Sequence, residues 1–271
     1  IPAPSSISYT NSASGSCLIS GTATSTQTAA PGLCGGTITE TWNATDACGR
    51  TIAPVTRTIT VNPAPVATFT NVPANITVDC GSIPVPSSIS YSNGASGSCL
   101  ISGTATSTQT AAPGLCGGSI TETWAATDAC GRTIVPITRT ITVRPAPVAT
   151  FTNVPANITV DCGSIPAPSA ISYTNGANGS CLISGTATST QTAAPGLCGG
   201  TITETWTATD ACGRTIAPVT RTITVNPAPV ATFANVPANI TVDCGSIPAP
   251  SSISYTNSAS GSCLISGTAT S

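Results

Sequence analysis

Short runs in which β-branched residues alternate with polar residues recur along the chain, separated by Gly, Pro and Asn. Alternation of this kind predicts half-buried β-strands, and no window carries the apolar face of a helix, so we expect an all-β protein with almost no helix. Segment 100–110 is expected to be one long strand or two, kinked at Gly103. In residues 66–147 the predicted strands are 66–70 and 75–79, interrupted at Val72-Pro73, then 87–92, 100–110, 119–127 and 133–143.

This pattern of strands is repeated. The segment that begins at Ile1 returns at Ile83, Ile165 and Ile247, which gives a period of 82 residues. A unit of this size is too long for a solenoid repeat and suits a small sandwich domain with its own core. We expect the copies to belong to a longer array. The predicted division is a partial repeat at 1–65 without its first strand, complete repeats at 66–147 and 148–229, and the N-terminal half of a repeat at 230–271.

Each repeat ends in Pro-Ala-Pro, at the joints Asn62–Pro65, Arg144–Pro147 and Asn226–Pro229. Proline fixes its own φ and restricts the residue before it, so these joints favour extended polyproline geometry. A joint with so few free torsions is a semi-rigid spacer. We therefore expect consecutive domains to form an extended rod.

Thirteen cysteines fall at four per period, and the chain contains no histidine. This regularity favours disulfides over a metal site, and disulfides indicate an oxidising compartment: the periplasm, the cell surface or the medium. Four cysteines permit three pairings within a repeat. Because antiparallel strands place alternate loops at opposite ends of a domain, we expect partners at the same end. The predicted pairs are Cys17–Cys48, Cys80–Cys116, Cys99–Cys130, Cys162–Cys198 and Cys181–Cys212, with Cys34, Cys244 and Cys263 left without partners.

Charged residues make up only 6% of the chain, the net charge is −2, and there is no lysine. Nucleic acid is therefore a poor partner, and the usual general bases and Schiff-base formers are absent. Asp79 and Asp128 are expected at opposite ends of a repeat, which disfavours a paired-carboxylate hydrolase site. Asp128 is expected to accept backbone N–H groups in its own turn, with a calcium site between neighbouring repeats as the alternative. We expect no enzyme activity, no cofactor and no metal.

The largest apolar side chains are three equivalent tryptophans, which we assign to the core, with a sugar-stacking surface as the alternative. By alternation, Glu122 shares a strand face with Trp124. Arg139 lies nearly opposite Glu122 across the hairpin. This placement predicts a cross-strand ion pair, or a solvated pair at the rim that contributes under ~1 kcal/mol. The tryptophans are Trp42, Trp124 and Trp206.

Threonines alternate along several predicted strands. An ordinary exposed β face explains them, since threonine is favoured on strands. A flat array of threonines that binds ice, a glycan or another filament is the alternative. The rows are Thr104, Thr106, Thr108 and Thr110 on one strand face, Thr121 and Thr123 in the hairpin, and Thr138, Thr140 and Thr142 in the last strand.

The hairpin at 121–143 resembles the end of a hyalin-repeat (HYR-like) domain, an immunoglobulin-like sandwich. Thr127, Asp128, Cys130 and Gly131 match that family's turn, while Arg132 replaces the usual Asn. Ile137 stands where the family often has a further cysteine, so the family's pairing does not carry over. Versions with a cysteine in the turn resemble domains of long surface adhesins of gliding Bacteroidota. The resemblance implies tandem immunoglobulin-like domains with an adhesion or stalk role, and it names no ligand.

These observations favour a structural stalk or filament segment of a secreted or cell-surface adhesin, because near-identical copies provide length and not distinct specificities. A glycan- or ice-binding module and a spacer array of a larger extracellular enzyme are the alternatives. The expected partners are neighbouring repeats, other copies of the same chain, and a surface or glycan ligand. We expect no membrane span in this segment.

Overall fold

The computed structural model describes residues 1–271 and is all-β, with no α-helix and four single-turn 3-10 segments. It contains two compact units. The first unit comprises residues 1–77, 84–112 and 119–142, and the second comprises 78–83, 113–118 and 143–271. Each unit contains one of the first two Pro-Ala-Pro joints together with residues from the repeats on both sides of it. The 3-10 segments are Gly15–Cys17, Gly97–Cys99, Gly179–Cys181 and Gly261–Cys263.

In the first unit, four antiparallel strands form a sheet in the order β1-β2-β3-β4. A second sheet has the order β5-β7-β8. A third sheet has the order β6-β11-β10-β9. These strands are β1 (Ser6–Thr10), β2 (Ser20–Gln27), β3 (Gly36–Thr45), β4 (Thr51–Val61), β5 (Thr68–Phe69), β6 (Ile76–Val78), β7 (Ser88–Ser92), β8 (Ser102–Thr106), β9 (Thr108–Gln109), β10 (Gly118–Thr127) and β11 (Thr133–Val143).

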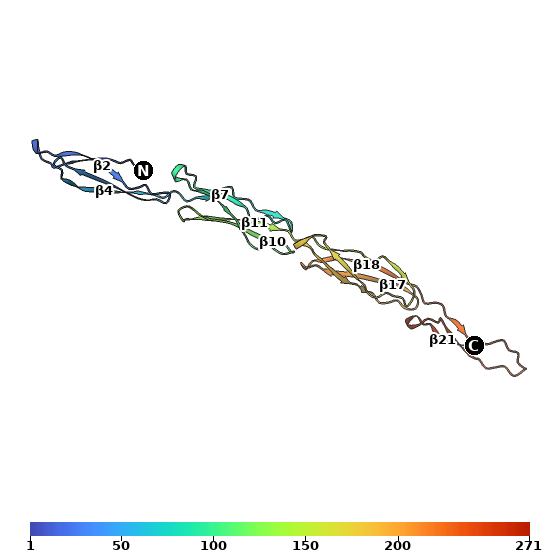
Figure 1. Ribbon diagram of the computed structural model, residues 1–271. Helices are drawn as coiled ribbons and strands as arrows, with labels where there is room; N and C mark the ends of the chain where they lie inside the picture. The colour runs from blue at the N-terminus through green and yellow to red at the C-terminus, as the bar shows by residue number, and fades with distance from the viewer. The chain divides into compact units, whose positions relative to one another are not determined.

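The second unit contains sheets in the orders β12-β14-β15, β13-β18-β17-β16 and β19-β20-β21, of which the first two match β5-β7-β8 and β6-β11-β10-β9. β17 and β18 lie side by side (Figure 1), with Glu204 opposite Arg221. β13 pairs with β18 in parallel. These strands are β12 (Thr150–Phe151), β13 (Ile158–Val160), β14 (Ala170–Thr174), β15 (Ser184–Thr188), β16 (Thr190–Gln191), β17 (Gly200–Thr209), β18 (Thr215–Val225), β19 (Thr232–Ala234), β20 (Ser252–Thr256) and β21 (Ser266–Thr270).

The predicted strands of residues 66–147 are confirmed, except at 100–110. That segment forms two strands, but the break lies at Ser107 and not at Gly103. Gly103 sits in the middle of β8 opposite Tyr91, and a Cβ there would lie 2.4 Å from the tyrosine oxygen, so the glycine makes room for the ring. Ser107 is buried, and its hydroxyl donates to the Glu122 carboxylate.

The break at Ser107 also corrects the expected threonine row. After this residue the chain leaves the β5-β7-β8 sheet and joins the sheet of β10 and β11. Thr104 and Thr106 therefore belong to one sheet and Thr108 to another, so the four threonines do not share one strand face. All four are exposed.

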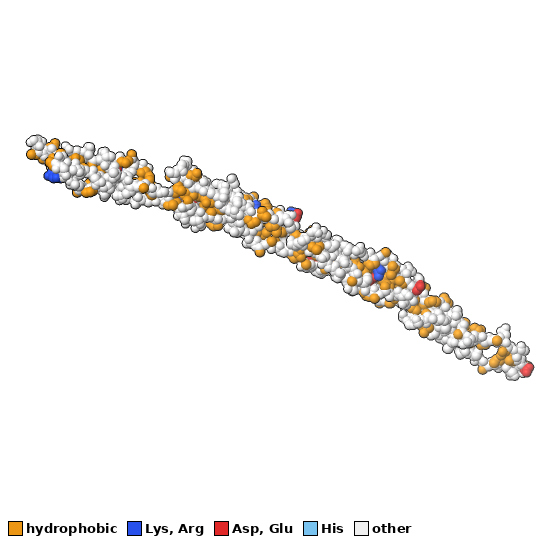
Figure 2. Space-filling model, viewed as in Figure 1, with side chains coloured by type: hydrophobic (Ala, Val, Ile, Leu, Met, Phe, Trp, Pro, Cys, Tyr) orange, Lys and Arg blue, Asp and Glu red, His pale blue; other side chains and the backbone are white.

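In the three repeats that contain a tryptophan, this side chain lies in the core. Trp124 and Trp206 are 0% exposed and Trp42 is 6% exposed. Each indole N–H donates at 2.9 Å to a serine carbonyl, for example from Trp124 to Ser87, which satisfies the buried polar atom. Outside this core the surface is mostly uncharged, and charged side chains are few and scattered on the face shown in Figure 2.

Candidate functional site: the joints between repeats

The four disulfides join each repeat to the following one. At the joint Arg144–Pro147, Cys116 is bonded to Cys212 with a Cα separation of 5.2 Å, and Cys80 is bonded to Cys181 at 5.9 Å. Cys34–Cys130 spans the joint Asn62–Pro65, and Cys162–Cys263 spans the joint Asn226–Pro229. The bonded residues are 96 or 101 positions apart, which is more than one repeat.

The predicted pairing within repeats is therefore wrong. Cys80 and Cys116 do lie at the same end of their repeat, as expected, but each is bonded to a cysteine of the next repeat. The physical reason is that this end faces the next repeat across a short joint, so the nearest thiol belongs to the neighbour. None of the five predicted pairs forms: Cys17–Cys48, Cys80–Cys116, Cys99–Cys130, Cys162–Cys198 and Cys181–Cys212. Cys34 and Cys263, which were expected to lack partners, are bonded. The free thiols are exposed and belong to Cys17, Cys48, Cys99, Cys198 and Cys244.

The hairpin loop that carries Cys130 is fixed by Asp128. Its Oδ1 accepts the N–H of Cys130 at 2.9 Å and of Arg132 at 3.0 Å, and Oδ2 accepts Arg132 Nε at 2.9 Å. The role expected of Asp128 in its own turn is confirmed. Burial alone would raise the pKa of the Asp128 carboxyl, but the bonds from Arg132 and Cys130 lower it.

The same arginine reaches the joint. Arg132 Nη1 donates to the carbonyl of Ala64 at 2.7 Å, and Nη2 donates to that of Pro65 at 3.3 Å. At the second joint Arg214 makes the same bonds to Ala146 and Pro147, at 2.7 and 3.3 Å. A guanidinium suits this position because its planar fork serves a carboxylate and two carbonyls together.

The other side of the joint is held by the loop before Cys116. The N–H of Ala146 donates to the carbonyl of Leu115 at 2.8 Å. Gly117 follows with φ +73°, and a Cβ there would lie 2.6 Å from the Val143 carbonyl oxygen and 2.7 Å from Pro145 N. Only glycine permits this close approach between loop and joint.

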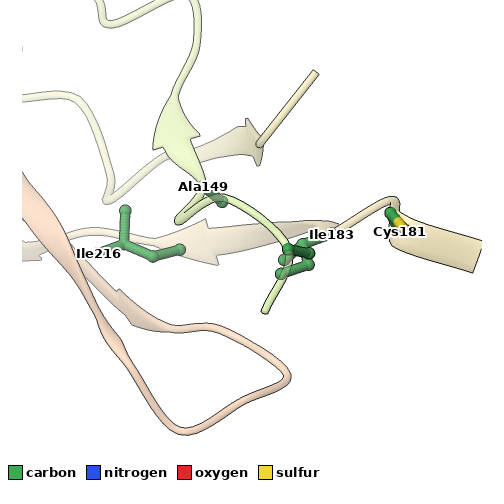
Figure 3. Close-up of a cluster of buried hydrophobic side chains, with 5 residues drawn as sticks. Ala149, Cys181, Ile183 and Ile216 are labelled. Carbon is green, nitrogen blue, oxygen red and sulfur yellow. The ribbon is translucent and has the colours of Figure 1, made fainter. Parts of the chain in front are cut away.

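Apolar side chains from both repeats fill the second joint. Ala146, Ala149, Ile183 and Ile216 are at most 2% exposed and form one cluster with Cys181, against which Cys80 and Leu115 pack. Figure 3 shows these side chains coming from separate segments of the chain. Ala64, Ala67, Ile101 and Ile134 form the equivalent cluster at the first joint, with Leu33 against it. The joint is thus a small core of its own and not a solvated linker.

Sequence reasoning identified the proline joints but missed Arg132, Arg214 and Leu115 as residues that fix them. The only signal was the departure of Arg132 from the Asn usual in the hyalin-repeat turn. Periodicity and strand alternation contain no information on where a guanidinium five bonds from the backbone will reach.

The buried carboxylate of Glu122 is fully occupied. It accepts Ser87 N and Oγ at 3.1 Å, the Ser107 hydroxyl, and Arg139 Nε. The predicted Glu122–Arg139 ion pair is confirmed, but it is buried and not at the rim: the two side chains are 0% and 11% exposed. Arg139 also lies 5.8 Å from the ring centroid of Trp124.

The same bonds lower the pKa of each equivalent glutamate. Burial alone would raise the pKa of Glu122, but hydrogen bonds from Ser107, Arg139 and Ser87 outweigh it. The pKa of Glu204 is lowered in the same way, by hydrogen bonds from Ser189, Arg221 and Ser169. The pKa of Glu40 falls to about 2. The ionised form is therefore the one that the fold stabilises.

The structure brings no group of three or more His, Cys, Asp or Glu side chains together in a metal-binding arrangement. It contains no helix long and apolar enough to cross a membrane. Comparison with protein-family models and with curated proteins finds no match to this chain. The similarity to hyalin repeats therefore rests on the hairpin residues quoted above.

Proposed function

We propose that this chain is a structural, non-catalytic segment of the stalk or filament of a secreted or cell-surface adhesin. The observation that carries the proposal is the set of disulfides that joins each repeat to the next. Disulfides of this number indicate an oxidising environment. Covalent links between successive repeats are useful where tension passes from one repeat to the next, and they contribute nothing to a reaction.

At the level of the fold, we propose tandem immunoglobulin-like sandwiches arranged as an extended rod. Two sheets in the repeat 148–229 support the sandwich, since β12 contacts β18 and β15 contacts β17 from one sheet to the other. The restricted Pro-Ala-Pro backbone, hydrogen-bonded through Arg214 and Leu115, supports a stiff joint.

Small-angle scattering should give a maximum dimension over ~100 Å, from strands of 8–10 residues at ~3.4 Å rise. A compact particle of the same mass would contradict the rod.

The disulfides also overlap along the chain, which gives a mechanical prediction. Tension between the ends passes through the shortest covalent path, which follows residues 1–34, 130–162 and 263–271. At ~3.4 Å per residue this path is about 25 nm long, against about 90 nm for the reduced, fully unfolded chain.

Single-molecule stretching of the chain tests this role, with the free thiols alkylated beforehand. The oxidised protein should stop extending near 25 nm, and addition of a reductant should release the remaining length. Full extension of the oxidised protein to the reduced length would show that the disulfides do not transmit tension and would remove the basis of the structural role.

The proposal that the chain is not an enzyme rests on the state of its carboxylates. Glu122 and Asp128 are engaged by arginine and by backbone or serine donors, and the chain has no histidine or lysine to act as a base. A spacer array attached to an extracellular enzyme would use the same structural properties.

A threonine-rich sheet face supports ice or glycan binding as a second candidate function. On β17 and β18, Thr201 pairs with Thr224, Thr203 with Thr222 and Thr205 with Thr220. Neighbouring strands lie ~4.8 Å apart and alternate residues ~6.7 Å apart, so the hydroxyl and methyl groups form a regular grid. Ice shaping, or retention on a glycan column, that is lost in Thr203→Tyr would favour this function. No effect on ice and no retention would leave the threonines as an ordinary exposed β face.

A further inference from the structure

Two disulfides cross the joint Arg144–Pro147, and their surroundings differ. This joint lies near the middle of the chain, far from either end. In the first disulfide, Cys181 is 6% exposed and belongs to the apolar cluster of the joint. In the second, Cys116 is exposed, and its partner Cys212 is partly exposed. One bond is therefore enclosed by apolar side chains, and the other can be reached from solvent.

The enclosed bond is covered at Cys181. Ile183 and Ile216 are at most 2% exposed and belong to the same cluster as this cysteine. Gly81 also lies close, since a Cβ there would be 3.4 Å from Cys181 Sγ. Cys80 is partly buried against the same cluster. A thiolate that attacked Cys80 would expel Cys181 as a thiolate into apolar surroundings, where burial disfavours the charged form.

The bond between Cys116 and Cys212 has no such cover. Cys116 lies in a loop between strands in which Ala111, Ala112 and Gly114 are also exposed. A reductant can approach Cys116 Sγ from solvent, and the expelled Cys212 thiolate is partly hydrated. Exposed disulfides are the labile ones in proteins, whereas well-enclosed disulfides resist reduction. The two bonds of one joint should therefore differ in reactivity.

The same contrast is present at the other joints. Cys34, the equivalent of Cys116, is exposed at the joint Asn62–Pro65. Cys263, the equivalent of Cys181, is 3% exposed at the joint Asn226–Pro229. The difference in exposure thus follows from the position of the cysteine in its repeat and not from one particular loop.

We propose that Cys116–Cys212 and Cys34–Cys130 are sites of reversible reduction by a dithiol, while Cys80–Cys181 and Cys162–Cys263 stay closed under the same conditions. Each joint then has two classes of covalent link. One is permanent, and the other responds to the redox state of the surroundings.

The reaction is a thiol–disulfide exchange in two steps. A thiolate of the dithiol bonds to Cys116 Sγ, the bond between the two cysteine sulfurs breaks, and Cys212 leaves as a thiolate that takes up a proton. The second thiol of the dithiol then attacks the mixed disulfide and releases Cys116. The dithiol is oxidised to a cyclic disulfide, and the protein gains two electrons and two protons.

The two thiols remain neighbours after the bond opens. Asp210 Oδ1 still accepts the N–H of Cys212 at 2.9 Å, which holds the hairpin loop. The N–H of Ala146 still donates to the carbonyl of Leu115 at 2.8 Å, which holds the other loop. Because Cys80–Cys181 keeps the repeats joined, an oxidant such as oxidised glutathione re-forms the open bond and becomes two thiols.

Partial reduction has a mechanical consequence. With only Cys80–Cys181 and Cys162–Cys263 closed, the shortest covalent path follows residues 1–80, then 181 back to 162, then 263–271. At ~3.4 Å per residue this path is about 37 nm long, between the about 25 nm of the oxidised chain and the about 90 nm of the reduced chain. A mild reductant thus lengthens the segment without releasing it. This consequence rests on the structural role proposed above, whereas the order of reduction does not.

Differential alkylation of the full chain tests the order of reduction. The free thiols are first blocked with N-ethylmaleimide, the folded protein is treated with dithiothreitol for increasing times, and new thiols are trapped with iodoacetamide. Tandem mass spectrometry should find Cys116 and Cys212 labelled at least about tenfold faster than Cys80 and Cys181. When dithiothreitol is instead replaced by oxidised glutathione before trapping, Cys116 and Cys212 should be bonded to each other again.

Two variants test whether the enclosure of Cys181 causes the difference. Ile183→Ala removes part of the apolar cluster and should speed the opening of Cys80–Cys181 without changing Cys116–Cys212. Leu182→Ala is the matched control at the neighbouring position, because Leu182 is 43% exposed, and it should change neither rate. If Ile183→Ala does not fold, the order of reduction in the wild type decides.

The inference is overturned if Cys80–Cys181 opens first or at the same rate, or if neither bond opens before the protein unfolds. It is also overturned if the opened bond does not re-form, or if a folded Ile183→Ala variant reacts as the wild type does. None of these outcomes affects the stretching test of the structural role, which compares only the fully oxidised and fully reduced chains.

Discussion

Cys116, in the loop before β10, is bonded to Cys212, in the loop between β17 and β18; the two residues are 96 positions apart in sequence, and their Cα atoms are 5.2 Å apart. The bond crosses the joint Arg144–Pro147 from one repeat to the next. Cys80–Cys181 crosses the same joint. Two covalent links, an arginine and a small apolar cluster therefore fix a joint that contains only four residues of chain.

The first prediction concerns the glycine that lets the Cys116 loop approach the joint. Gly117→Ala should destabilise the protein by more than about 1 kcal/mol, because φ is +73° and the new Cβ would lie 2.6 Å from the Val143 carbonyl oxygen. Urea unfolding followed by tryptophan fluorescence measures the change. Gly114→Ala is the matched control in the same loop, since nothing lies within 4 Å of a Cβ there. Equal effects of the two variants would show that the close approach does not matter.

The second prediction concerns the arginine at the joint. Arg214→Lys keeps the charge but cannot serve Asp210 and the carbonyls of Ala146 and Pro147 together. We expect Tm to fall by several degrees and the amide of Ala146 to exchange hydrogen faster. Arg144→Lys should change stability by under about 1 kcal/mol, because its pair with Asp79 is exposed on both sides. An unchanged Tm and exchange rate in Arg214→Lys would contradict a fixed joint.

The third prediction concerns pH. The pKa values of Glu40, Glu122 and Glu204 are lowered from 4.5, with Glu40 at about 2, so the unfolded state binds protons first as the pH falls. The stabilisation is complete above about pH 4.5 and should be lost progressively as the pH falls towards 2. Free energies of unfolding at pH 7, 4 and 2.5 measure this loss.

Glu204→Gln serves as the comparison for the pH series. This variant should be less stable at pH 7, because a neutral amide replaces the ionised partner of Arg221, and its stability should fall less on acidification. A wild-type stability that stays constant or rises between pH 4 and pH 2.5 would refute the role assigned to these carboxylates.

Much of the fold was predictable because strand alternation is local. The hairpin 119–127 with 133–143, the interruption at Val72-Pro73 and the turn of Asp128 all follow from residues close in sequence. The break at Ser107 was not predictable, because it depends on a buried carboxylate 15 residues away.

The disulfide pairing shows a different limit. End-to-end placement of the loops put Cys80 and Cys116 correctly at one end of the repeat. Periodicity then left the partner ambiguous, because Cys130 of the same repeat and Cys212 of the next occupy equivalent positions in sequence. Only the proximity of loops across the joint, fixed by Arg214 and Leu115, distinguishes them.

Disulfide mapping tests the covalent joining of repeats most directly. Trypsin cuts after every arginine here except Arg144, which precedes Pro145, so all cysteines fall in the four fragments 1–50, 58–132, 140–214 and 222–271. The protein is alkylated and unfolded at low pH to prevent exchange, then digested without reductant. The structure predicts that all four fragments remain linked in one species, through Cys34–Cys130, Cys80–Cys181, Cys116–Cys212 and Cys162–Cys263. Recovery of four separate fragments, each with its disulfides inside it, would contradict the account.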